Sequence, residues 1–123
     1  MTEVQPKKIV LFDDDEDILS ICSYILSEAG WEVHSFTDCN HVIERVEKIM
    51  PSVILMDNWI PDVGGIETTR QLKKDPKLKD IPVIYFSANS DIQQLAESAG
   101  AETYLAKPFD LDDLQKKVNE YSL

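Results

Sequence analysis

The sequence predicts an α/β fold in which five parallel strands form one sheet with helices on both faces. Short apolar runs of strand length alternate with longer segments whose apolar residues recur at helical spacing, which gives five strand-helix units. Strands that alternate with helices form parallel sheets joined by right-handed crossovers. Some of the runs are apolar throughout, which is typical of strands buried on both faces.

The first half of the chain contains two of these units. Residues 9–12 form the first apolar run, and residues 32–36 alternate polar and apolar side chains, which predicts a strand at an edge of the sheet. Between them lies a helical stripe that ends at Gly30, made of Ile18, Ile21, Cys22, Ile25, Leu26 and Ala29. Asp38 is expected to cap the next helix. That helix ends at Pro51 and carries Val42, Ile43, Val46 and Ile49.

The second half contains three units. Residues 53–56 and 82–86 are apolar runs, and residues 103–106 form the fifth strand. Helices are predicted over residues 66–74 and, with few apolar anchors, over residues 91–99, where Gly100 ends the pattern. A loop carries Pro61, Gly64 and Gly65. The stripe of the last helix consists of Leu111, Leu114, Val118 and Tyr121.

Length and composition predict a single domain, residues 1–123, because 123 residues lie near the commonest domain size and 43% of them are apolar. No apolar run approaches the roughly 18 residues that cross a bilayer, and Met1 to Lys8 lack the apolar core of a signal peptide, so we expect a cytoplasmic protein. A net charge of −11 argues against nonspecific nucleic-acid binding. Cys22 and Cys39 form no metal or redox pattern and are expected to be buried or half-buried thiols.

Polar residues follow four of the predicted strands. Asp13 and Asp14 follow the first strand, Asp57 the third, Ser87 the fourth and Lys107 the fifth. In an open parallel sheet, ligands sit at the carboxyl ends of the strands, where the strand order reverses. We therefore expect these side chains to converge at one edge of the sheet.

Carboxylates gathered in this way repel each other, and a hard divalent cation such as Mg²⁺ or Mn²⁺ relieves the repulsion. Asp57 can then act as a nucleophile on phosphorus. Phosphoryl transfer mainly requires positioning and neutralisation of the phosphoryl oxygens, which the metal, Lys107 and the Ser87 hydroxyl would provide.

Each of these signals also has a plainer interpretation. The acidic residues from Asp15 onward are typical of a solvated helix start, with Asp15 as the N-cap. An aspartate after a strand, such as Asp57, is often a turn former, and a lysine such as Lys107 is usually solvated. Pro108 after Lys107 suggests a sharp turn, with a trans bond as the default and a cis bond as the alternative. The combination at one sheet edge is what favours a site.

In their order and placement these motifs resemble those of the bacterial response-regulator receiver family, of which the chemotaxis regulator is the simplest member. The resemblance begins at about residue 7, which leaves residues 1–7 as a short N-terminal extension. It rests on Ile9-Val10-Leu11-Phe12-Asp13-Asp14-Asp15, Val53-Ile54-Leu55-Met56-Asp57, Ile60-Pro61 with Gly65, Phe86-Ser87-Ala88, and Tyr104-Leu105-Ala106-Lys107-Pro108-Phe109. The fold that it implies is a flavodoxin-like, doubly wound sheet of five parallel strands in the order 2-1-3-4-5.

The resemblance implies a metal-dependent phosphorylation site. Asp57 is the implied phosphoacceptor, which takes a phosphoryl group from a histidine kinase or phosphotransfer domain. Asp14 is the implied direct ligand of Mg²⁺ and Asp13 a ligand through water, while the backbone carbonyl of Trp59 completes the metal site. Lys107 is the implied phosphate-binding lysine.

The resemblance also implies a switch. Ser87, where threonine is more usual, supplies the switch hydroxyl, and Tyr104 is the aromatic that moves inward when the hydroxyl moves toward the phosphate. The fourth helix, fifth strand and fifth helix form the implied surface for a protein partner or output domain. Trp59 is large for its position. It either lies on the surface or covers a neighbouring loop, or its indole hinders the water that hydrolyses the aspartyl phosphate, and the resemblance places Asn89 near the same water.

Two other functions remain as alternatives. A phosphatase of the haloacid dehalogenase type would use an Asp-x-Asp motif, which Asp13-x-Asp15 matches poorly, and a late acidic pair, whereas Asp112-Asp113 starts a helix. A binding module with the receiver fold that takes no phosphate is the second alternative. The sequence favours a phosphoacceptor switch with no separate substrate over both, and it leaves open whether the chain stands alone or belongs to a longer regulator or hybrid kinase.

Overall fold

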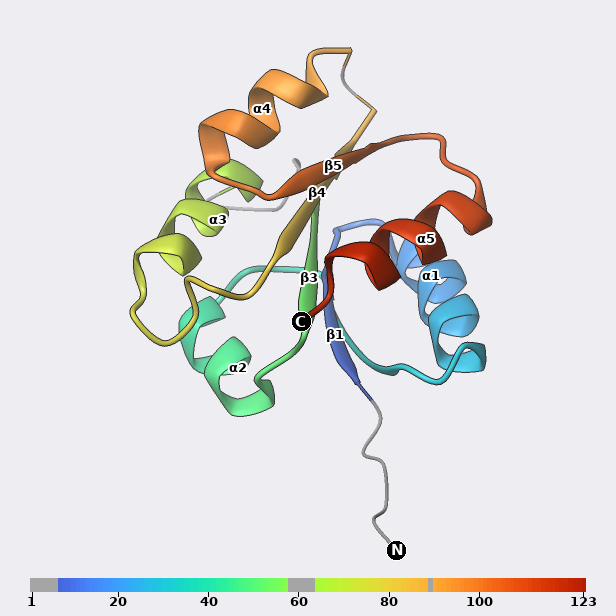
Figure 1. Ribbon diagram of the computed structural model, residues 1–123, viewed down its shortest axis with the longest axis horizontal. Coiled ribbons are helices and arrows are strands. Elements are labelled where there is room, and N and C mark those ends of the chain that lie inside the picture. Colours follow the sequence, from blue (N-terminus) through green and yellow to red (C-terminus); the bar gives the residue numbers. More distant parts are fainter. Residues whose placement is uncertain (1–6, 58–63, 89) are drawn as a thin grey trace, which may run out of the picture.

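A computed structural model describes residues 7–57, 64–88 and 90–123. It contains one sheet of five parallel strands in the order β2-β1-β3-β4-β5, as the sequence predicted (Figure 1). The elements in chain order are β1 (Lys8–Phe12), α1 (Glu16–Glu28), β2 (Glu32–Phe36), α2 (Val42–Ile49), β3 (Val53–Asp57), α3 (Gly65–Lys74), β4 (Val83–Ser87), α4 (Ile92–Ala99), β5 (Thr103–Ala106) and α5 (Leu111–Tyr121).

The helices cover both faces of the sheet and divide the core into two halves. Figure 1 shows α1 and α5 on one face and α2, α3 and α4 on the other. Successive strand residues point to opposite faces, so in β1 Ile9 and Leu11 pack toward α1 and α5, whereas Val10 and Phe12 pack toward α2, α3 and α4. The fully apolar runs therefore belong to strands buried on both sides, as the sequence indicated.

The two outer strands are more exposed than the inner three. β2 has no fully buried residue, which agrees with the edge position predicted from its alternating pattern. Phe36 of β2 stacks on Phe12 of β1 with ring centroids 5.5 Å apart, which fixes the edge strand to the sheet. At the other edge, β5 pairs only with β4 among the described strands.

The structure corrects the expected start of α2. The helix begins at Val42, after His41 in the left-handed conformation at φ 53°, and Asp38 does not cap it. Instead, the Asp38 carboxylate accepts hydrogen bonds from the Asn40 backbone N–H and from the Arg45 guanidinium, at 3.0 and 2.9 Å. Those two bonds fold the chain into a turn before the helix starts, so buried Cys39 lies in the turn.

The predicted helical stripes are only partly buried. On α1, Ile21 is 54% exposed, and Leu19, which the stripe omitted, is buried in its place. On α5, Leu114 and Val118 are buried, whereas Leu111 and Tyr121 are exposed. Each helix presents a narrower face to the sheet than the apolar pattern indicated, and the surplus apolar residues lie on the surface.

Other local predictions are confirmed. The Asp15 carboxylate caps α1 by accepting hydrogen bonds from the backbone N–H groups of Asp17 and Ile18. Cys22, like Cys39, is a buried free thiol. Across residues 7–57, 64–88 and 90–123, none of the helices combines the length and apolarity needed to span a bilayer.

Candidate functional site

The polar residues at the strand ends meet where the strand order reverses, between β1 and β3. Phe12 of β1 lies beside Met56 of β3, so Asp13, which directly follows β1, and Asp57, which ends β3, are brought together at the carboxyl edge. Both carboxylates are buried, with 1% and 3% of each residue exposed. Ser87 ends the adjacent strand β4 and is also buried.

Lys107 directly follows the edge strand β5 and reaches both buried carboxylates. Its ammonium donates hydrogen bonds to Asp13 Oδ2 at 3.0 Å and to Asp57 Oδ1 at 2.8 Å. The ammonium also lies 4.5 Å from the centroid of the Phe86 ring and makes a cation–π contact with it. The Lys107 backbone N–H donates to the Ser87 carbonyl at 2.9 Å, and the Lys107-Pro108 peptide bond is cis. One lysine therefore joins the ends of β1, β3, β4 and β5.

Burial and neighbouring charges shift the pKa values of Asp13 and Lys107. Burial raises the pKa of Asp13, and the charge of Asp57 raises it further, against the hydrogen bonds from the Asp15 N–H and from Lys107, which lower it. Burial would lower the pKa of Lys107, but its hydrogen bonds to Asp57 and Asp13 outweigh that effect and raise it. The lysine is thus held as a cation between two carboxylates.

Three carboxylates can share one cation at this edge. One oxygen each from Asp13, Asp14 and Asp57 lie within 4.8 Å of one another, with Asp14 exposed and the other two buried. Three negative charges face the single positive charge of Lys107, so the cluster carries an excess negative charge. An all-oxygen set with this excess fits Mg²⁺ or Mn²⁺, which prefer carboxylates and water.

Tyr104 lies on β5, the edge strand next to β4, on which Ser87 lies. It is half-buried and packs against the core half that contains α4. The ammonium of Lys117 on α5 lies 5.5 Å from the centroid of its ring. Sequence reasoning did not single out Lys117, since a lysine in an amphipathic helix carries no signal of its partner.

Two predicted site residues lie outside the described part of the chain. The Trp59 carbonyl was expected to bind the metal, and Trp59 and Asn89 were expected to modulate hydrolysis. Both remain predictions.

An apolar groove opens beside Lys107, between α1 and the start of α5. Its volume is about 320 Å³, and its lining includes Ile18, Ile21, Pro108, Phe109 and Leu111. Ile21 and Leu111 are 54% and 40% exposed. The apolar residues that the stripes placed in the core therefore form a surface next to the charged site.

The chain matches a known protein family along most of its length. The family is described as the response regulator receiver domain, and the match covers residues 9–119. The DNA-binding dual master transcriptional regulator RpaA of Synechocystis is 31% identical over 113 residues, which cover 90% of this chain and 47% of RpaA. Sporulation initiation phosphotransferase F of Bacillus subtilis is 29% identical over 117 residues, with 94% and 93% covered. The chain thus spans at most half of several curated relatives and nearly all of others.

Solved structures agree with the fold. The receiver domain of the sensor histidine kinase PA1611 from Pseudomonas aeruginosa, solved with a magnesium ion coordinated in its active-site cleft, has a TM-score of 0.87 at 25% identity, with 95% of this chain and 98% of that chain covered. The chemotaxis response regulator CheY4 of Vibrio cholerae has a TM-score of 0.87 at 24% identity, with 95% and 99% covered. Together with the family match and the acidic pocket at the switch point, these similarities show that the chain belongs to the response regulator receiver domain family of two-component systems.

Proposed function

We propose that Asp57 accepts a phosphoryl group and that its phosphorylation switches the conformation of the domain. The observation that carries this proposal is the bridge from Lys107 to Asp13 and Asp57 inside a cluster of three carboxylates. Such a cluster is costly for the fold on its own, because two of its carboxylates are buried and all three repel each other. A divalent cation bound by the three carboxylates would offset this cost, which is why the arrangement favours a site for a cation and a phosphoryl group.

In the proposed reaction, an Asp57 carboxylate oxygen attacks the phosphorus of a phosphohistidine. The new P–O bond forms as the P–N bond breaks, and the electron pair passes to the imidazole nitrogen of the donor. Lys107, already 2.8 Å from Asp57, would bind one phosphoryl oxygen, and Ser87, at the end of the neighbouring strand β4, would bind another through its hydroxyl. Asp13, Asp14, Asp57 and the Trp59 carbonyl would hold Mg²⁺ or Mn²⁺, whose charge neutralises the phosphoryl oxygens when it is bound.

The proposed switch links Ser87 to Tyr104. A Ser87 hydroxyl drawn toward the phosphoryl group would leave space that Tyr104 enters, and the change is a shift between two populations. Ser87 lies beside Ala106 on β5, two residues from Tyr104, so a local shift is transmitted along one strand. The surface of α4, β5 and α5 would then present a different face to a protein partner or an output domain.

The donor is proposed to be a histidine kinase or a phosphotransfer protein. It has to bring its phosphohistidine to Asp57, so it contacts the surface around the site. The apolar groove beside Lys107 is continuous with that site and exposes Ile21 and Leu111, which suits the apolar side chains of a donor protein. We propose a cytoplasmic location. We also propose no direct contact with nucleic acid, in line with the net charge of −11.

The test is incubation with acetyl phosphate and Mg²⁺, followed by the intact mass of the protein. Wild type should gain one phosphoryl mass, and Asp57→Asn should gain none. Asp113→Asn on α5, an exposed carboxylate outside the site, is the matched control and should behave like wild type. Wild type without added mass would favour the binding module that takes no phosphate, and rapid turnover of a generic phosphoester would favour a phosphatase.

Whether this domain acts on an attached output domain or on a separate partner protein is a further part of the proposal. The curated relatives include transcriptional regulators and a sensor kinase of which this chain spans 17–50%. An output surface on α4, β5 and α5 suits either an attached domain or a separate protein.

A further inference from the structure

Lys117 connects α5 to both faces of the edge strand β5. Its ammonium donates a hydrogen bond to Thr103 Oγ1 at 3.1 Å and lies 5.5 Å from the centroid of the Tyr104 ring. Thr103 and Tyr104 are successive strand residues, so their side chains point to opposite faces of the sheet. A single ammonium therefore reaches around the open edge of β5.

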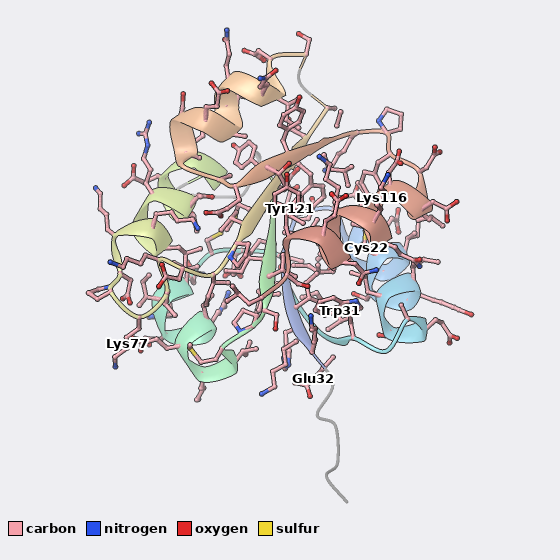
Figure 2. The ribbon with its side chains drawn as sticks, in the orientation of Figure 1. Cys22, Trp31, Glu32, Lys77, Lys116 and Tyr121 are labelled. Carbon is pink, nitrogen blue, oxygen red and sulfur yellow. The ribbon has the colours of Figure 1, made fainter. Side chains whose placement is uncertain are left out.

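The surroundings hold the ammonium in place. The ring of Tyr121, four residues further along α5 and thus on the same helix face, has its centroid 5.9 Å from Lys117 Nζ. Lys117 is half-buried, whereas its neighbour Lys116 is exposed on α5, where Figure 2 labels both Lys116 and Tyr121. The ammonium thus sits between two aromatic rings and a hydroxyl, which restricts its movement.

We propose that Lys117 is a positioning residue that holds Tyr104 in the place it occupies here and so opposes switching. The proposal rests on the function proposed above, which gives Tyr104 its part in the switch. The attraction between the ammonium and the ring exists only while the ring lies at the edge of β5, and a ring that moved toward Ser87 would lose it. Any contact made in one of two states alone shifts the equilibrium toward that state.

The expected size of the effect is modest. Cation–π pairs of partly exposed groups are worth a factor of about two to five in an equilibrium constant. By linkage, a phosphoryl group or its mimic must overcome the same factor when it binds, so the protein without this contact should bind the mimic about two to five times more tightly.

A plainer explanation is that Lys117 only protects the edge of β5 from pairing with other chains. In that case its removal would promote association between molecules and leave the Tyr104 ring unchanged. The two explanations therefore differ in what the ring does.

The experiment compares wild type with Lys117→Met, which keeps the length of the stem, and with Lys117→Arg, which keeps the cation. Lys116→Met removes the neighbouring exposed charge and is the matched control. NMR of ¹³C-labelled tyrosine, with Tyr104 assigned through Tyr104→Phe, reports the ring in the unphosphorylated protein. Titration with beryllofluoride and Mg²⁺ reports the affinity for the phosphoryl mimic.

Lys117→Met should shift the Tyr104 ring signals and bind beryllofluoride about two to five times more tightly, while Lys117→Arg and Lys116→Met stay near wild type. Unchanged ring signals and affinity in Lys117→Met, or an equal change in Lys116→Met, would overturn the proposal. If wild type binds no beryllofluoride, the proposed function has failed, and the ring signals alone still decide whether Lys117 holds Tyr104.

Discussion

Replacement of Lys107 by methionine should destabilise the fold through charge. Asp13 and Asp57 have carboxylate oxygens within 4.8 Å of each other, and at an effective dielectric constant of about 20 their repulsion is about 3.5 kcal/mol. The Lys107 side chain is 16% exposed and the two carboxylates are almost fully buried, so solvent screens this repulsion little. Removal of one partner from a buried ion pair costs about 3–5 kcal/mol. Methionine removes the ammonium, which lies over the Phe86 ring, but keeps an unbranched apolar side chain.

We therefore expect Lys107→Met to lower the free energy of unfolding by about 3 kcal/mol when divalent cations are removed by chelation. Excess Mg²⁺ should recover most of this loss, since the cation neutralises the same carboxylates and binds only the folded state. Urea unfolding followed by circular dichroism, with and without Mg²⁺, measures both quantities.

The control is Lys116→Met, an exposed lysine on α5 whose loss should change stability by less than about 0.5 kcal/mol. A loss in Lys107→Met that is equally large in chelator and in Mg²⁺ would refute the electrostatic reasoning. It would instead assign the loss to packing.

Three further predictions concern the groove, the thiols and the hydrolysis of the phosphate. Ile21→Glu should slow phosphoryl transfer from a donor protein at least tenfold and leave uptake from acetyl phosphate unchanged; equal rates from the protein donor would remove the groove from the interface. Burial raises the pKa of the Cys22 and Cys39 thiols from 9.0 to about 11, so alkylation of these thiols should be slow until the protein unfolds. The neutral buried thiols contribute to the free energy of unfolding below pH 9.0, and this contribution should be lost as the pH rises toward about 11. Trp59→Asn should shorten the lifetime of phosphorylated protein measured by intact mass, and an unchanged lifetime would end the idea that the indole hinders water.

The sheet was predictable because its inner strands are buried on both faces. A strand in that position must be apolar throughout, and residues 9–12, 53–56 and 82–86 are such runs. The placement of Asp13 and Asp57 followed from topology, since residues at the ends of neighbouring parallel strands share one edge.

Contacts between side chains were less predictable. The reach of Lys107 to both Asp13 and Asp57, and of Lys117 to Tyr104, depends on distances between elements that no local pattern encodes. The predicted start of α2 was wrong for a related reason. Asp38 had the right chemistry to cap α2, but Arg45 and the backbone of the turn compete for the same carboxylate.

The bridge from Lys107 to Asp13 joins residues that are 94 positions apart in the chain. No fragment that ends before β5 can contain the complete charge cluster, so the proposed phosphorylation would require almost the whole domain to be folded. If Asp57 accepts phosphate as proposed, the rate at which a refolding or newly synthesised chain gains reactivity toward a small phosphodonor would report the docking of the last strand.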